Sequence, residues 1–345
     1  MTLTFFDLGK SSSYIATSTT AKHVFIKRTG RTYLQTSSNY GFSWTTIPGS
    51  SMPVLSTGYV TVSISDNGQH LVVYISGTPT VYCSLDGGAT WPYSKNIGAS
   101  INYVAVNNTG QYIAILDQTK VYVSDDYGAT FSDKTPVLSG TSDYRHASIS
   151  DSGDIIVTCD LTGTADYACF TSTNAGDTWT RRDPFPEPHP VQCQSKEVMM
   201  DSTGDKVGIT FAVTGPPYPI QQGLILLSDN GGIDWYEVGS SWTSLSSQID
   251  VINCDSTGDV ITVNYANQYP NQYSHVSFDR GISWDTVHYD ITGYHAIIGF
   301  YRSGIATGGT KIYIVGKFGI ERPFIYPAFP TGSAGKRAQF ISWWN

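Results

Sequence analysis

The sequence has little charge and few helix-forming residues. Asp, Glu, Lys and Arg together make up 14% of its 345 residues, and Glu occurs only four times. The net charge is −8, and the basic residues form no cluster larger than short pairs such as Arg181–Arg182. Binding to nucleic acid or to an anionic membrane surface needs a basic patch. The composition therefore argues against both kinds of partner.

Long apolar runs and paired cysteines are also missing. No stretch approaches the roughly 18 apolar residues of a membrane span, and the N-terminus, MTLTFFDLGK, lacks the basic start and apolar run of a secretory signal. We therefore expect neither membrane insertion nor a classical signal. The five cysteines contain no C-x-x-C pair, so we expect neither a zinc knot nor a disulfide framework. We also expect no other metal site and no cofactor. A single disulfide between Cys159 and Cys169 stays open.

The sequence does contain one short motif that occurs six times, and we call this motif the box. Its first residues are Ser37, Ser84, Ser124, Ser172, Ser228 and Ser277, and it reads SSNYGFSW, SLDGGATW, SDDYGATF, STNAGDTW, SDNGGIDW and SFDRGISW. Successive boxes end 40 to 56 residues apart. Upstream of most boxes lies a second phrase, in which two alternating apolar runs flank a D/N-x-x-G turn, and this pattern predicts a β-hairpin.

A unit of four short antiparallel strands that repeats at this spacing is typical of a β-propeller blade. We therefore predict an all-β fold, a single seven-bladed β-propeller over residues 1–345, with six blades as the alternative. A seventh hairpin at 296–309 follows the last box and supports the larger number. The predicted blades span residues 8–47, 59–94, 101–133, 145–182, 195–239, 248–288 and 295–330, and residues 331–345 form a tail or a ring-closing strand.

The box has the features of a structural turn. Its third position is Asp in three copies and Asn in the other three, an exchange that a catalytic acid or a metal ligand does not usually tolerate. A side-chain oxygen that accepts hydrogen bonds from its own turn does tolerate it. We expect the glycine to need a positive φ and the closing aromatic to pack between sheets. The structural residues of the six boxes are Asn39, Gly41, Trp44, Asp86, Gly88, Trp91, Asp126, Gly128, Phe131, Asn174, Gly176, Trp179, Asn230, Gly232, Trp235, Asp279, Gly281 and Trp284.

The pattern S-x-D/N-x-G-x-S/T-W resembles the Asp-box, or BNR repeat, of the sialidase superfamily. The resemblance covers nearly the whole chain and implies that the boxes are the turns between the third and fourth strands of each blade, on the face opposite the ligand. It also implies three arginines for a sialidase, the first in an R-I-P motif. This sequence has no R-I-P, and no Tyr/Glu pair can be assigned in it. We therefore assign no catalytic residue and favour a member that is not an enzyme.

Function is then expected in the loops of the other face, which are rich in Tyr, Pro, Asn and Gln. Aromatic rings stack on sugars while amides pair with hydroxyl groups, so these loops favour a neutral glycan. The candidate contacts are Tyr218, Trp242, Tyr265, Tyr269, Tyr273, Tyr289 and Tyr294. The same composition suits a protein partner, which leaves an assembly scaffold open, with a glycoside hydrolase as a further alternative. We expect an attachment or surface protein, on a virion or cell surface, rather than a cytoplasmic one.

Overall fold

The computed structural model describes residues 12–18, 22–28, 33–39, 43–47, 60–75, 78–137, 142–161, 166–185, 192–215, 218–238, 249–265, 272–289, 300–305, 312–316 and 324–325. Within these residues every regular element is a β-strand, and the strands form antiparallel sheets in simple chain order. The predicted all-β fold is therefore confirmed for this part of the chain. No helix in it is long and apolar enough to cross a bilayer.

The first three sheets each contain four strands. Sheet 1 consists of β1 (Ser12–Thr17), β2 (Val24–Arg28), β3 (Leu34–Ser37) and β4 (Thr45–Ile47). Sheet 2 consists of β5 (Val60–Ile64), β6 (Leu71–Ile75), β7 (Thr80–Ser84) and β8 (Tyr93–Asn96). Sheet 3 consists of β9 (Tyr103–Val106), β10 (Ile113–Leu116), β11 (Val121–Ser124) and β12 (Ser132–Asp133).

The next three sheets also have four strands, and the last has three. Sheet 4 consists of β13 (Ser142–Ile149), β14 (Ile155–Leu161), β15 (Asp166–Ser172) and β16 (Thr180–Arg182). Sheet 5 consists of β17 (Gln192–Met200), β18 (Val207–Gly215), β19 (Tyr218–Ser228) and β20 (Tyr236–Val238). Sheet 6 consists of β21 (Ile249–Cys254), β22 (Ile261–Tyr265), β23 (Gln272–Ser277) and β24 (Asp285–Tyr289), and sheet 7 of β25 (Phe300–Ile305), β26 (Ile312–Gly316) and β27 (Phe324–Ile325).

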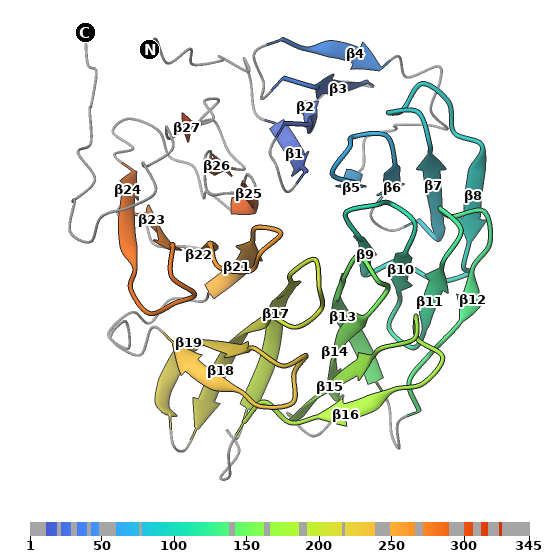
Figure 1. The fold of residues 1–345 in the computed structure, drawn as a ribbon. Helices are drawn as coiled ribbons and strands as arrows, with labels where there is room; N and C mark the ends of the chain where they lie inside the picture. Colours follow the sequence, from blue (N-terminus) through green and yellow to red (C-terminus); the bar gives the residue numbers. More distant parts are fainter. Residues whose placement is uncertain are drawn as a thin grey trace, which may run out of the picture.

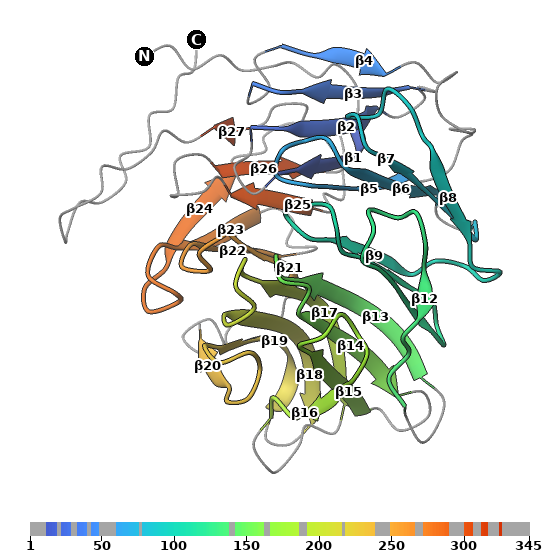
Figure 2. The ribbon, with the colours of Figure 1, turned by 45° about the vertical axis from the view of Figure 1, so that its right-hand side comes forward.

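The sheets stand around a common centre, with the first strand of each innermost (Figure 1). Each of these inner strands packs against the next, and β25 contacts β1, so the series closes into a ring. In the turned view the strands of sheet 1 lie side by side at the top, and sheets 4 and 5 lie at the bottom (Figure 2). The two segments proposed to supply a ring-closing strand, residues 2–6 and 340–344, lie outside the described residues.

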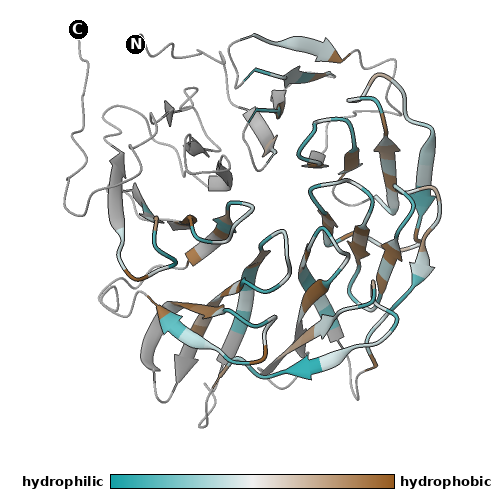
Figure 3. Ribbon diagram, viewed as in Figure 1, coloured by the Kyte–Doolittle hydropathy of each residue, from teal (hydrophilic) through white to brown (hydrophobic). Residues whose placement is uncertain are grey.

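The core lies between neighbouring sheets rather than inside any one of them. A cluster that includes Leu34 of sheet 1 and Leu71 of sheet 2 fills the first interface, and equivalent clusters fill each interface from sheet 2 to sheet 6. Strands β6 and β10 are buried along their whole length, because a neighbouring sheet covers each face. Hydrophobic residues accordingly follow these central strands, while hydrophilic residues gather at the turns (Figure 3).

The box forms a closed turn held by its own side chains. In the second copy, Gly88 N donates to Ser84 Oγ (2.8 Å), and Ser84 Oγ donates to Asp86 Oδ1 (2.9 Å). Thr90 N also donates to Asp86 Oδ1 (2.8 Å). In the fourth copy Asn174 Oδ1 accepts the same bond from Thr178 N (2.9 Å). One oxygen performs the same task in both residue types, which is the physical basis of the exchange.

Two residues of the box have positive φ angles, although the sequence pattern indicates only one. The box glycines from Gly88 to Gly281 have φ between +82° and +91°, while Gly41 lies outside the described residues. The residue before the glycine is also left-handed, including the non-glycine residues Tyr127, Ala175 and Arg280 (φ +52° to +61°). A side chain in this region costs free energy. At Tyr127 and Arg280 the side chain reaches the preceding sheet, which offsets that cost.

The closing aromatics lie at the border of the core, not deep inside it. We expected them as large buried pieces between the sheets, but all six are only partly buried. Five of them pack against the rim of an inter-sheet cluster, namely Trp91, Phe131, Trp179, Trp235 and Trp284. The reason is their place at the outer end of the turn, where one edge of the ring contacts water. Cys169 lies opposite Thr158 and is a free thiol, so it forms no disulfide with Cys159.

The three Asp boxes predict a specific response to acid. Burial alone raises the pKa of Asp86, Asp126 and Asp279, but hydrogen bonds from the Thr or Ser and backbone groups of each turn outweigh it and hold the pKa below its usual value. A lowered carboxyl pKa stabilises the folded state above the unfolded pKa of about 3.9, and this contribution is lost as the pH falls through the folded value. As the pH falls, the variant with all three residues changed to Asn should therefore lose less stability than the wild-type protein does.

Thermal midpoints measured from about pH 5 down to about pH 2 would check this. Asn230→Asp, which adds a fourth ionisable box, is the reverse control and should steepen the loss in acid. Parallel curves for wild type and the triple variant would contradict it.

Candidate functional site

The hairpin turns and the boxes lie at the same end of the six sheets that contain a box, and we call this end the box end. Box backbone amides donate to the hairpin of their own sheet, as Gly87 N does to Gln69 O (2.8 Å) and Tyr127 N to Gln111 O (3.1 Å). Each inner strand runs toward its hairpin, so its first residues lie toward the opposite end, the loop end. A ligand site on the loop end must use the early residues of the inner strands and the connections around them.

Four of the predicted tyrosines lie in described strands, and three sequence candidates do not. Tyr265 ends β22, while Tyr273 and Tyr289 lie on β23 and β24 of the same sheet, next to each other in register because Tyr273 pairs with His288 and Gln272 with Tyr289. The structure therefore brings three of them to the loop end of sheet 6. Tyr218 begins β19 in sheet 5, opposite Gly215. Trp242, Tyr269 and Tyr294 lie outside the described residues.

Three inner strands, β13, β17 and β21, carry a β-bulge at the same position relative to the hairpin glycine. Pairing shifts between Tyr144 and His146 in β13, between Ser195 and Glu197 in β17, and between Ile249 and Val251 in β21. A bulge bends its strand and re-aims the side chains beside it. The same kind of bulge therefore sets the direction of the two side chains that follow the first two bulges, His146 and Glu197.

Three side chains from consecutive inner strands meet there: Tyr103 of β9, His146 of β13 and Glu197 of β17. Tyr103 Oη donates to Glu197 Oε1 (2.8 Å), and His146 Nδ1 lies 3.6 Å from the same oxygen. The tyrosine and imidazole rings meet edge to face, with centroids 5.4 Å apart. We call this group the mouth cluster. Its members are up to 94 residues apart in the sequence, and they meet because the sheets are arranged in a ring around a common centre.

The mouth cluster is largely removed from water. The side chains of Glu197 and His146 are 13% and 20% exposed. Glu197 Oε1 also accepts from Val198 N (3.3 Å), while His146 Nδ1 is buried without a hydrogen-bond partner. A desolvated carboxylate beside an unsatisfied imidazole nitrogen is costly, and such arrangements gather at functional sites.

A second polar group borders the cluster. Arg145 Nη2 forms an ion pair with Asp143 Oδ2 (2.6 Å), and Asn102 Nδ2 donates to Asp143 Oδ1 (2.9 Å). Asn102 also donates to Tyr144 O (3.0 Å), which ties sheet 3 to sheet 4. Asp143 is 10% exposed on its side chain while Arg145 is 43% exposed. A planar guanidinium is thus held at the surface beside the cluster.

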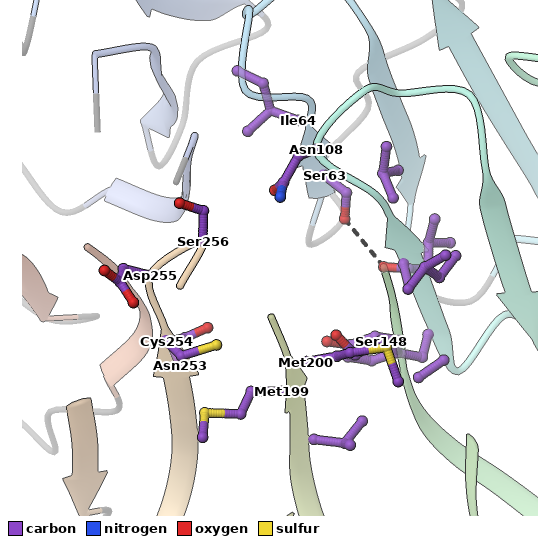
Figure 4. A pocket seen from close by; sticks show the side chains of 17 residues that line it. Ser63, Ile64, Asn108, Ser148, Met199, Met200, Asn253, Cys254, Asp255 and Ser256 are labelled. Carbon is purple, nitrogen blue, oxygen red and sulfur yellow. Dashed lines mark hydrogen bonds between the residues drawn. The ribbon is translucent and has the colours of Figure 1, made fainter. Parts of the chain in front are cut away.

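A central cavity continues from the mouth cluster toward the box end. Its volume is about 160 Å³, and it is lined by residues of β5, β9, β13, β17 and β21, Tyr103 among them. Ser63, Asn108, Ser148, Asn253 and Ser256 lie around the hollow from different sides, and Ser63 Oγ donates to Val104 O (3.1 Å) (Figure 4). Polar side chains and strand edges make this space suited to water.

The mouth cluster offers a carboxylate, an imidazole nitrogen and two aromatic rings to a ligand that enters from the loop end. Carboxylate and neutral imidazole accept hydrogen bonds from hydroxyl groups, and aromatic rings pack on apolar faces. None of the three residues is among the candidates from sequence. A signal existed: Tyr103, His146 and Glu197 each stand seven residues before a hairpin glycine, namely Gly110, Gly153 and Gly204.

Comparisons with known proteins agree with this architecture. YCF48 from Cyanidioschyzon merolae superposes with a TM-score of 0.62 at 13% identity, over 92% of this chain and 96% of that one. YCF48 bound to D1 peptide superposes with a TM-score of 0.58 at 14% identity, over 93% and 92%. The Dos1 propeller superposes with a TM-score of 0.59 at 11% identity, over 94% of this chain and 85% of that one. The fold is a β-propeller.

A Niastella koreensis GH74 enzyme matches this propeller at a TM-score of 0.51 and 14% identity, over 88% of this chain and 62% of its own. No family model and no curated protein matches the sequence. At these identities the solved structures share the fold alone with this propeller. The six four-stranded sheets are its blades 1 to 6.

Proposed function

We propose that this protein is a non-enzymatic Asp-box propeller, related to the sialidases, that binds a neutral glycan at its loop end. The observation that carries the proposal is the mouth cluster, where Tyr103, His146 and Glu197 converge from three blades. We further propose that sheet 7 is a seventh blade and that the protein acts in attachment, as on a virion or cell surface.

Two features support a sugar as the ligand. Acceptors and aromatic rings occur together in the mouth cluster, and sugar rings present hydroxyl groups around an apolar face. Three tyrosines gather at the loop end of blade 6, whose inner strand β21 packs against β17. A glycan could then contact the cluster and the tyrosines at once.

A protein or peptide at the same end is the second candidate. The match to YCF48, which has been solved with a D1 peptide bound, favours it. Peptide carbonyls and side chains can also use a surface of Tyr, Asn and Arg. A glycosidase needs a second carboxylate about 5 to 10 Å from the first, across the bound sugar. The GH74 match keeps that activity as an outcome to be tested.

Replacing Tyr265, Tyr269 and Tyr273 by Ala should abolish retention on a neutral-glycan array and leave the unfolding midpoint nearly unchanged, because loop-end residues contribute little to the core. The matched control replaces three exposed aromatics of the box end, Tyr127, Tyr236 and Phe278 (38–39%), and should keep binding. Wild-type protein that binds no neutral glycan but retains peptides would favour the second candidate. Release of reducing sugar at an enzymatic rate would favour the glycosidase.

A further inference from the structure

We propose that His23 and His70 make the contacts between blades 1, 2 and 3 sensitive to acid, so that a mild fall in pH loosens this side of the ring while the equivalent contacts from blade 3 to blade 6 persist. The inference concerns a conformational property of the ring and is independent of the proposed function. It starts from one repeated position at the box end of the described blades.

In blades 1 to 5 the last residue of the hairpin turn lies against the hairpin glycine of the next blade, and we call it the turn-end residue. Its backbone amide donates to a side chain at the start of its own turn, as His70 N does to Ser65 Oγ (3.0 Å). A Cβ added to the next glycine would lie 2.2 to 2.9 Å from the turn-end side chain. The pairs are His23 with Gly68, His70 with Gly110, Tyr112 with Gly153, Asp154 with Gly204, and Lys206 with Gly258.

A proton on both ring nitrogens would be costly at His70. The imidazole packs on Tyr127 of blade 3, with ring centroids 4.7 Å apart, and its Nδ1 is buried without a hydrogen-bond partner. In the neutral ring Nδ1 can stay unprotonated, but in the imidazolium it becomes a donor, and a buried donor without an acceptor costs free energy. Burial accordingly lowers the pKa of His70. No acidic group on the surrounding hairpins and boxes offsets this shift, and these groups are Asp66, Asp86, Asp125 and Asp126.

His23 repeats the arrangement between blades 1 and 2. Its imidazole lies against the hairpin of blade 2, where Nδ1 would be 2.2 Å from a Cβ added to Gly68. Burial lowers the pKa of His23, and the neighbouring cation Lys22 lowers it further, while Asp66 of blade 2 opposes both effects. Both imidazoles are therefore neutral at neutral pH, and each takes up a proton only at the expense of its contact with the next blade.

Acid should loosen blades 1 to 3 before the rest of the ring. Histidines of the unfolded chain titrate near pH 6.5, and a lowered pKa in the folded state means that the unfolded chain binds more protons below this value. The stability that the two contacts give is therefore complete above about pH 6.5 and falls as the pH drops toward the folded pKa. The turn-end residues of blades 3 to 5 are of types that normally titrate below about pH 5 or above about pH 9. One side of a closed ring can open locally without global unfolding.

The test follows backbone hydrogen exchange by mass spectrometry at about pH 7.5 and about pH 5.5, corrected for the pH dependence of the intrinsic exchange rate. In the wild-type protein, peptides from the hairpins of blades 2 and 3, residues 60–75 and 103–116, should lose at least about threefold in protection at the lower pH. Peptides from blade 5, residues 192–215, should lose none. The experiment uses no ligand, so its result is independent of glycan binding.

The double variant His23→Tyr with His70→Tyr should keep its protection at about pH 5.5. Blade 3 provides the model for this change, because Tyr112 occupies the same position against Gly153 with a side chain that does not titrate in this range. The double variant His23→Gln with His70→Gln is a second form without an ionisable ring, and it keeps the test valid if the larger tyrosines disturb the packing. The reverse variant, Tyr112→His, should extend the acid effect to the hairpin of blade 4.

The pattern of protection decides the outcome. A loss confined to blades 1 to 3 in the wild-type protein, and absent from either double variant, would support the inference. A loss of equal size in the wild-type protein and in both double variants would overturn it, because the two histidines would then not be the source. Protection that is unchanged in the wild-type protein, or lost evenly over blades 1 to 6, would overturn it as well.

Discussion

Replacing Gly110 by Ala is expected to lower the free energy of unfolding by about 3 to 5 kcal/mol, from backbone strain and overpacking together. Gly110 closes the hairpin of blade 3 with φ +82°, and an added Cβ would lie 2.4 Å from both Cβ and Cγ of His70 in blade 2. His70 has little room to yield, because its ring packs on Tyr127 with centroids 4.7 Å apart. Urea denaturation measures the loss.

Gly98→Ala is the matched control for this change. Gly98 also has a positive φ (+78°), but an added Cβ meets nothing within 4 Å. It should cost only the strain of a left-handed alanine, about 1 kcal/mol. The double variant Gly110→Ala with His70→Ala should recover part of the loss, since neighbouring changes are not additive. Equal losses for Gly98→Ala and Gly110→Ala would show that close packing of the hairpins is unimportant.

Replacing Arg280 by Ala should cost about 2 to 4 kcal/mol, because it leaves the carbonyl groups of two buried residues, Ser228 and Gly258, without their charged donor. Arg280 lies in the box of blade 6, is 11% exposed, and donates to Asp229 Oδ1 (2.8 Å) and Ser228 O (2.6 Å) of blade 5. It also donates to Gly258 O (2.9 Å) in its own hairpin. Denaturant unfolding would measure this loss, and the midpoint for Arg280→Ala should be lower than that of the wild-type protein.

The control for Arg280 is Arg181→Ala, at an exposed position of the outer strand β16. Surface changes of this kind usually stay within about 0.5 kcal/mol. Arg280→Lys keeps the charge but cannot make the forked contacts, so it should lose nearly as much as Ala. A midpoint for Arg280→Ala equal to that of Arg181→Ala would contradict a role for this side chain in joining blades 5 and 6.

The strands could be predicted from the sequence because the repeat is local. Each hairpin and each box is a turn with its own hydrogen bonds, such as those of Ser84 and Asp86, so a short segment contains the information that forms it. The positive φ before the box glycine escaped prediction, because Tyr127, Ala175 and Arg280 are residues that rarely adopt it. The partial burial of the closing aromatics escaped prediction as well, because it depends on how far the packed core between the sheets extends toward the box.

The mouth cluster could not be predicted as a group, because closure of the ring creates it. Tyr103, His146 and Glu197 are unlike residues in different repeats, and their contacts follow from the curvature that places β9, β13 and β17 side by side. Glu197 shares with Tyr103 and His146 only its position seven residues before a hairpin glycine, and this spacing does not show that the three side chains meet. The predicted tyrosines were chosen from composition, and only those at the ends of strands in blades 5 and 6 can be placed.

Direct backbone bonds join neighbouring blades at the box end, from Asp66 N to Asn108 O, from Asp151 N to Ser202 O and from Ser202 N to Ser256 O (2.7–3.1 Å). Under the proposed function the ligand lies at the other end of the same strands, where Asn102 also joins sheet 3 to sheet 4. We expect substitutions seven residues before a hairpin glycine to change ligand preference while the hairpins and boxes stay as they are. New ligand preferences would then arise with little effect on folding.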